Sequence, residues 1–224
     1  MATSLTYHDK VAVIDLGDDE NRFAPDFIEA MNGHLDTAVN DGAQALVTTA
    51  SGKFYSNGLD LEWLMANGDR TQWYVDRVHA LFARVLALPI PTAAALPGHA
   101  FGAGAMLAMA HDYRVMRADR GFFCFPEVDI HIPFTTGMAA LIQAKLTPQA
   151  AVASMTTGRR FGGTDAQAAG IVDATAPEGA VKDDAIGMVA PLGIKDQATL
   201  GAIKQTMFAD AIAALTPKSE AEEA

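Results

Sequence analysis

The sequence predicts an α/β fold in which helices cover a parallel sheet. Short apolar runs alternate with stretches whose apolar residues recur every three to four positions, and glycines and prolines separate them. A strand–helix–strand order favours parallel pairing, because the chain must cross back over the sheet between neighbouring parallel strands. Half of the 224 residues are hydrophobic and 19% are charged, which is typical of a globular chain that buries a full core.

The first half of the chain follows this alternation element by element. Pro25 suits the first turn of a helix that continues to about Asn40, because the missing N–H of proline is not needed there. A second helix is expected around residues 74–85 and a third after Gly104. The expected strands are four apolar runs at residues 10–16, 45–49, 92–96 and 112–116.

The second half is predicted to be mainly helical. From about Thr135 onward the chain is rich in alanine, with breaks at residues 158–163 and at Pro191. Only residues 171–172 suggest another short strand. A polar tail, expected to be solvated, follows Pro217. We therefore expect one domain, or one domain with a C-terminal appendage.

Composition argues against several functional classes. A net charge of −11 provides no basic stripe for nucleic acid, although a few local cations could still hold a phosphorylated ligand. No apolar run reaches the about 18 residues that a membrane span needs, and the N-terminus has no apolar signal core. Cys124 is the single cysteine and the six histidines lack metal-ligand spacing, so no disulfide, metal or separate cofactor is expected. A cytoplasmic location is the resulting expectation.

Three segments carry residues suited to chemistry, at 52–61, 96–112 and 123–129. In the first two, glycines stand at a turn from strand to helix, where unpaired backbone N–H groups can bind a developing oxyanion. In the third, Glu127 lies among phenylalanine, proline and valine. Desolvation there would raise the pKa of Glu127 and suit it to act as a general base near neutral pH. Donors for an enolate together with such a base predict a proton-transfer site.

These segments resemble three motifs of the enoyl-CoA hydratase/isomerase (crotonase) family. Residues 54–60, Phe-Tyr-Ser-Asn-Gly-Leu-Asp, and 98–104, Gly-His-Ala-Phe-Gly-Ala-Gly, resemble its two oxyanion loops. Residues 125–128, Phe-Pro-Glu-Val, resemble the segment with its second catalytic glutamate. The motifs occur in family order within a resemblance that covers about residues 8–175. It implies that the N–H groups of Leu59 and Ala103 bind the thioester carbonyl.

The resemblance also implies an architecture. The family fold is a spiral of ββα turns with two roughly perpendicular sheets, followed by a helical C-terminal region. We accordingly expect residues 1–175 to form the spiral with the active site. Residues 176–224 are expected to form a helical region for oligomerisation and an acidic tail. Assembly into a homotrimer or a dimer of trimers is the corresponding expectation.

Met106 distinguishes among the family's reactions. Hydratases of the family carry a glutamate at this position and use two glutamates to activate water, which a thioether cannot do. The remaining glutamate, matched by Glu127, acts alone in the delta-3, delta-2-enoyl-CoA isomerases. The sequence therefore predicts an isomerase of fatty acid β-oxidation that acts on acyl-CoA. A hydratase, a thioesterase or a non-catalytic CoA-binding protein remain alternatives.

Other residues are candidates for substrate binding, each beside a simpler structural interpretation. Glu127 could pair with an arginine, Asp60 could cap a helix, and Met106 could fill the core. The glycines could serve close packing or a dinucleotide turn, although Leu107 does not fit that turn. Exposed cations are often only solvated. The candidates for contact with CoA are Arg22, Lys53 and Lys204, and those in or beside the loops are Ser56, Gly58, Asp60, Gly102 and Met106.

Overall fold

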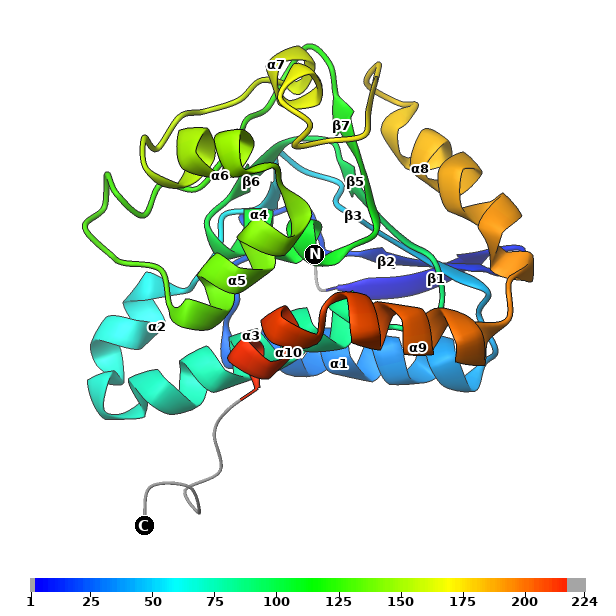
Figure 1. Ribbon diagram of the computed structural model, residues 1–224, viewed down its shortest axis with the longest axis horizontal. Helices are drawn as coiled ribbons and strands as arrows, with labels where there is room; N and C mark the ends of the chain where they lie inside the picture. The colour runs from blue at the N-terminus through cyan, green and yellow to red at the C-terminus, as the bar shows by residue number, and fades with distance from the viewer. Residues whose placement is uncertain (1–2, 217–224) are drawn as a thin grey trace.

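The computed structural model describes residues 3–216, and its larger sheet has six strands in the order β1-β2-β3-β5-β7-β9 (Figure 1). β1 and β2 pair antiparallel, and the other neighbouring strands of this sheet pair parallel. The expected parallel sheet is therefore present. The bounds of its strands are β1 Ser4–His8, β2 Val11–Asp15, β3 Ala45–Thr49, β5 Thr92–Leu96, β7 Tyr113–Arg117 and β9 Ala174–Ala176.

A smaller sheet contains three short parallel strands in the order β4-β6-β8. These strands are β4 Phe54–Ser56, β6 His99–Phe101 and β8 Phe123–Cys124. Each follows a strand of the larger sheet and precedes a helix, so the chain repeats a ββα turn three times. This repeat, with helices after it, confirms the spiral architecture that the resemblance implies.

Helices surround the two sheets and make up most of the chain after residue 135. Those of the spiral are α1 Pro25–Asn40, α2 Leu61–Ala66, η1 Gly68–Arg70, α3 Thr71–Leu86 and α4 Ala103–Ala110. Those that follow are α5 Thr136–Lys145, α6 Pro148–Met155, α7 Gly163–Ala168, α8 Val181–Val189, η2 Ala190–Ile194, α9 Gln197–Met207 and α10 Ala209–Leu215. Pro25 begins α1 as expected, and α1 ends at Asn40.

The larger sheet is buried on both faces because helices cover each of them. On one face, its small and branched residues pack against α8, as Ala93 and Val115 do in a cluster with Val189. On the other face lies the main core, to which α1, α3 and α4 contribute. Parallel strands covered in this way are continuous apolar runs, which is why β3 and β5 could be located to the residue from sequence.

Four strands were not expected from the residue pattern, and one was misplaced. The residues of β1 are mostly exposed at the sheet edge, so they form no apolar run. β4, β6 and β8 have only two or three residues, too few to show a period. The strand expected at residues 171–172 begins three residues later as β9, and Ile171 and Val172 are instead buried beside the end of α7.

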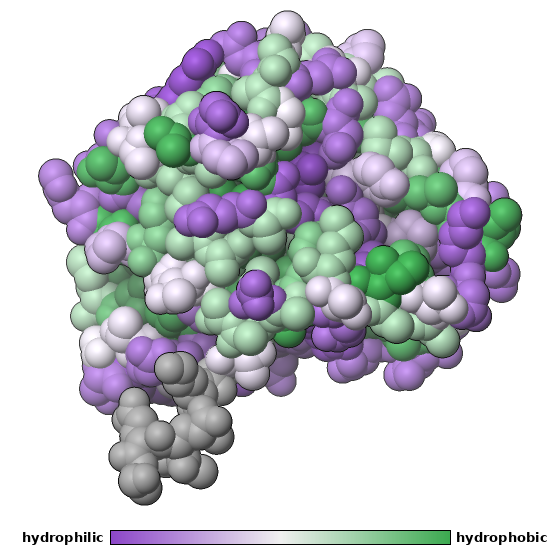
Figure 2. All heavy atoms as spheres, in the orientation of Figure 1, coloured by the Kyte–Doolittle hydropathy of each residue, from purple (hydrophilic) through white to green (hydrophobic). Residues whose placement is uncertain are grey.

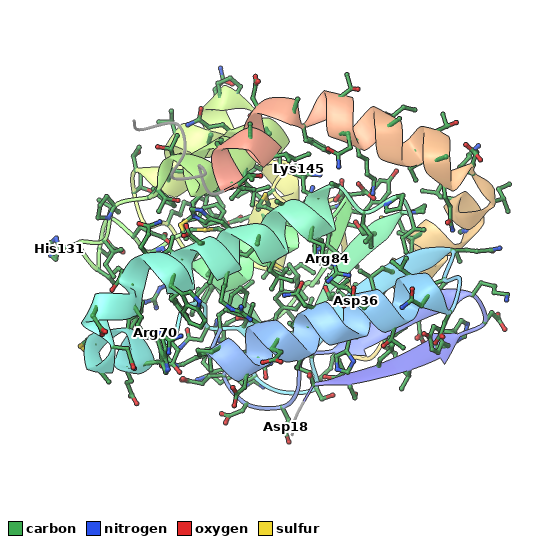
Figure 3. All side chains as sticks on the ribbon, turned by 90° about the horizontal axis from the view of Figure 1, so that it is seen from below. Asp18, Asp36, Arg70, Arg84, His131 and Lys145 are labelled. Carbon is green, nitrogen blue, oxygen red and sulfur yellow. The ribbon has the colours of Figure 1, made fainter. Side chains whose placement is uncertain are left out.

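The helices are joined to one another by close contacts and ion pairs. Arg84 of α3 reaches Asp36 of the neighbouring α1, with both labelled in Figure 3. α10 packs against α3 and α5. At Gly137 in α5, an added Cβ would lie 2.6 Å from the Ala214 carbonyl oxygen, so glycine permits the close approach of α10. The described part of the C-terminal region is thus packed on the spiral, while assembly into trimers stays a prediction.

Candidate active site

The two predicted oxyanion loops lie side by side at the carboxyl ends of β4 and β6, because neighbouring parallel strands end at the same edge. Gly58 has φ +83°, a conformation that favours glycine. A Cβ at Gly58 would stand 2.8 Å from the Phe101 carbonyl oxygen and 3.0 Å from the Ala103 nitrogen. Only a residue without a side chain allows this approach of the two backbones.

The second loop leads directly into α4. Ala103 is the first residue of that helix, so its N–H has no acceptor within the helix and stands at the positive end of the helix dipole. Gly102 precedes it with φ +51°. At Gly104, an added Cβ would lie 2.5 Å from the Ser56 carbonyl oxygen, which explains how α4 begins in contact with β4.

Glu127 follows β8 and faces the second loop. Its Oε1 lies 3.4 Å from the position that a Cβ on Gly102 would occupy. The residue is 8% exposed, and within residues 3–216 its buried Oε2 has no hydrogen-bond partner. Burial raises the pKa of Glu127 to about 7, and a hydrogen bond from its own backbone only partly opposes this. The carboxyl group therefore has no ion-pair partner among the described residues and exchanges its proton near neutral pH.

Glu127, Leu59 and Ala103 line one mainly apolar cavity of about 230 Å³. Its other lining residues come from the two loops, from α2, β6 and β8, from the segment between β8 and α5, and from the turns before α1 and α7. They are Arg22, Asn57, Leu61, Phe101, Gly102, Cys124, Pro126, Ile130, Ile132 and Arg160. Leu59, Ala103 and Glu127 are far apart in the sequence but meet at this cavity. The first two offer backbone N–H groups and the third offers a carboxyl group.

Ser56 and Asp60 brace the first loop. The hydroxyl of Ser56 is fully buried, donates to the Asn21 carbonyl oxygen at 2.7 Å and accepts from the Gly58 N–H at 3.1 Å. Asp60 caps α2 by accepting from the Trp63 N–H at 3.0 Å. The Asp60 N–H in turn donates to the Tyr74 hydroxyl at 3.0 Å. These contacts fix the backbone on either side of Leu59.

The cations expected to contact CoA differ in their placement. Arg22 lines the cavity, pairs with Glu20 at 2.5 Å and donates to the Leu59 carbonyl oxygen at 3.3 Å. Lys53 is exposed, with its Nζ 5.1 Å from the centre of the Phe54 ring.

Lys204 and Met106 lie outside the cavity of Glu127. Lys204 is 4% exposed and is held by Asp112 at 2.6 Å and by the Ile90 carbonyl oxygen at 2.8 Å, at a different cavity. Burial of this ammonium group within an ion pair leaves it no contact with the cavity of Glu127. Met106 is 1% exposed in the main core and is absent from the lining of that cavity.

Arg160 and Cys124 were missed because the tertiary structure brings them to the cavity. A two-residue bridge between Phe123 and Phe161 places the turn before α7 next to β8, and Arg160 comes with it. No spacing in the sequence indicates this contact. The Cys124 thiol donates to the Gly158 carbonyl oxygen at 3.2 Å, and burial raises its pKa to about 11, so it is unsuited to act as a nucleophile.

The described part of the chain contains neither a metal-binding cluster nor a membrane-spanning helix. Residues 3–216 contain no group of three or more side chains that could hold a metal ion. No helix among them is long and apolar enough to cross a membrane. The expected cytoplasmic location stays a prediction.

Comparison with known proteins relates the chain to acyl-CoA enzymes. It matches the enoyl-CoA hydratase/isomerase family over residues 6–224. It is 40% identical over 169 residues to enoyl-CoA delta isomerase 2, peroxisomal, of Arabidopsis thaliana, covering 71% of this chain and 70% of that protein. A putative enoyl-CoA hydratase of Thermus thermophilus is 29% identical over 209 residues, covering 89% and 81%. The crystal structure of a probable enoyl-CoA hydratase from Mycobacterium tuberculosis H37Rv is similar with a TM-score of 0.89 and 29% identity, covering 95% and 91%.

Proposed function

The chain belongs to the enoyl-CoA hydratase/isomerase family, and on that premise we propose that it is a delta-3, delta-2-enoyl-CoA isomerase. The observation that carries the proposal is the single carboxyl group of the cavity: Glu127 is the only acidic side chain among its described lining residues. Moving a double bond into conjugation with a thioester needs one group that removes a proton and returns it. Relatives named enoyl-CoA delta isomerase support the same reaction.

The proposed reaction begins with the thioester carbonyl between the two loops. The N–H groups of Leu59 and Ala103 donate to its oxygen, and they stabilise the negative charge that develops when a proton leaves C2. Glu127 takes that proton, giving a dienolate, and returns it at C4. The double bond then lies between C2 and C3. A pKa near 7 suits both steps, because the same group must be a base first and an acid second.

The surroundings of Glu127 favour proton transfer over water addition. Leu61, Ile130 and Ile132 are apolar, and the described lining residues include no second acid that could help Glu127 to activate a water. Met106 stands at the position where hydratases of the family carry a glutamate, and its thioether is buried in the core. An apolar wall also protects a dienolate from stray protonation.

A basic and aromatic patch beside the cavity suits the nucleotide of CoA. The ring of His99 lies 5.4 Å from Phe54, 5.1 Å from Phe101 and 5.5 Å from Phe122. Burial lowers the pKa of His99, and nearby cations lower it further. Those cations are Lys53, Arg120 and Arg160.

The patch is continuous with the catalytic cavity, because Phe101 and Arg160 belong to both. Although the chain has a net charge of −11, this local group of cations can pair with phosphates. The aromatic rings can stack on adenine. The thioester would then lie at the loops while the nucleotide lies on the small sheet. CoA is accordingly proposed as part of the substrate and not as a separate cofactor.

The test is the ultraviolet absorbance of the conjugated product formed from 3-enoyl-CoA. We expect turnover by the wild type and a loss of about 10²- to 10⁴-fold in kcat for Glu127→Gln, which keeps the shape and removes the base. Asp129→Asn is the matched control, because the same change is made two residues away on an exposed carboxylate. It should leave turnover unchanged.

The same samples should be given 2-enoyl-CoA in a second assay, in which hydration removes the conjugation signal. Little or no hydration is expected. No conjugation by the wild type with short and long chains, together with rapid hydration of 2-enoyl-CoA, would overturn the isomerase assignment in favour of a hydratase. Full activity of Glu127→Gln would overturn the role given to that residue.

A further inference from the structure

A second cavity, of about 370 Å³, lies where the C-terminal helices meet the edge of β7. Figure 2 shows hydrophobic side chains gathered over α9 beside a hydrophilic hollow. Lys145, at the end of α5, lies under the C-terminal helices in Figure 3. The cavity is lined by Pro91, Asp112, Tyr113, Lys145, Leu192, Lys195, Leu200, Ile203, Lys204, Met207 and Phe208.

The charges around this cavity do not balance. Asp112 is paired with Lys204 at 2.6 Å. Asp173 is paired with Arg114 at 3.2 Å. Lys145 is left without an ion-pair partner of its own: among residues 3–216 its Nζ makes no hydrogen bond or ion pair, and it lies 4.9 Å from the centre of the Phe208 ring.

Partial burial of Lys145 makes this imbalance costly. Desolvation lowers the pKa of its ammonium group to about 8, and repulsion from Arg114 and Lys204 adds to the effect. A charge held away from water is stabilised when an opposite charge and a hydrogen-bond acceptor are brought to it. The depth of the cavity thus presents a free cation, while its outer wall is apolar.

We propose that this cavity is a ligand site for a medium-chain monocarboxylate, with the carboxylate on Lys145 and the chain along α9. The apolar wall suits an alkyl chain, since Ile203 and Met207 are 54% and 70% exposed at its rim. The two cavities share no lining residue, so the inference does not depend on the proposed isomerase activity.

The neighbouring acids explain why the head group is a carboxylate and not a phosphate. Asp112 and Asp173 both interact electrostatically with Lys145 and would repel a dianion more strongly than a monoanion. One unmatched ammonium group can neutralise one negative charge. Lys195, exposed at the rim, adds a weaker attraction for the same anion.

The experiment is calorimetric titration of the full chain with octanoate, and with 1-octanol as the uncharged probe. The wild type should bind octanoate better than octanol. Lys145→Met keeps the length of the side chain without its charge and should weaken octanoate binding at least about tenfold. Lys145→Arg should retain binding. Lys182→Met, a change of the same kind on the exposed face of α8, should have no effect.

Binding should also weaken as pH rises. The groups that face Lys145 are Arg114, Asp112, Asp173 and Lys204, with Lys195 and Tyr113 in the same cavity. Only the protonated ammonium attracts the anion, so octanoate affinity should be constant between about pH 6 and 7, fall about twofold by pH 8 and about tenfold by pH 9. Lys145→Met should lose this dependence.

Two results would overturn the proposal. One is octanoate binding that survives unchanged in Lys145→Met, above all if Glu127→Gln strengthens it, because the anionic probe would then occupy the cavity of Glu127. The other is an absence of octanoate binding together with self-association by light scattering that Ile203→Asp abolishes. In that case a second copy of the chain covers this face.

Discussion

Glu127 and Asp112 are both carboxylates beside a cavity, Glu127 buried and Asp112 partly buried, yet their surroundings are opposite. Asp112 Oδ2 accepts from Lys204 at 2.6 Å, from the Thr92 N–H at 2.8 Å and from the Thr92 hydroxyl at 3.2 Å. Glu127 Oε2 accepts nothing from the described residues. Buried polar groups are paired as a rule, so an unpaired one is a candidate for function and a paired one for stability.

The two carboxylates differ in pairing because different residues surround them. Asp112 stands between α4 and β7, where Thr92 of the neighbouring strand and Lys204 of α9 converge on it, so it ties three elements together. Glu127 follows β8 in a segment flanked by Pro126 and Val128, which offer no side-chain donor. Asp112 is held in an ion pair with Lys204, whereas the raised pKa of Glu127 lets that group change its charge near neutral pH.

The largest expected effect comes from replacing each carboxylate with its amide. Glu127→Gln should abolish most of the proposed activity and leave the melting temperature unchanged or higher, because no partner is lost. Asp112→Asn should retain kcat but lose about 2–3 kcal/mol of unfolding free energy, since Lys204 would be left buried without its counter-charge. Turnover and urea denaturation of both variants provide the measurement. A lower unfolding free energy for Glu127→Gln would mean that the carboxylate makes a stabilising interaction that the amide cannot replace.

The next effect is on stability as a function of pH. The pKa of Glu127 is raised from 4.5 to about 7, so between these values the folded protein binds more protons than the unfolded chain. Its contribution is fully present below pH 4.5 and is lost as pH rises through 7, by roughly 3 kcal/mol. The difference in unfolding free energy between the wild type and Glu127→Gln isolates this contribution. A difference that does not change from pH 4.5 to 8 would contradict the unpaired state of the carboxyl group.

A smaller effect is expected in the pH dependence of the proposed reaction. Glu127 must be ionised to accept the C2 proton, so kcat/KM for 3-enoyl-CoA should rise about tenfold per pH unit below 7 and level off above it. Asp112→Asn should show the same profile, because its carboxylate does not take part. A profile that moves with Asp112 and not with Glu127 would reverse the roles given to the two residues.

The smallest effect concerns Arg160, which no spacing in the sequence singles out. Arg160→Ala should raise KM for 3-enoyl-CoA about five- to tenfold by removing a phosphate contact, with kcat little changed. The pantetheine thioester of the same acid lacks the nucleotide and should be turned over equally by both proteins. Arg159→Ala, a neighbouring arginine outside the cavity lining, is the control. An equal rise in KM for both substrates would mean that Arg160 contacts the acyl end of the substrate and not the nucleotide.

The sequence by itself determined the alternating α/β architecture, the two glycine-containing loops and the glutamate among apolar residues, because each depends on local features. Buried parallel strands are apolar runs, α1 begins at a proline, and the loops need glycine where an added Cβ would lie within 3 Å of a neighbouring backbone. The tertiary structure alone decided that Lys204 pairs with Asp112, that Met106 lies in the core and that Arg160 reaches the cavity. Whether a polar side chain is paired or free depends on which distant segment packs against it, and no local pattern contains that information.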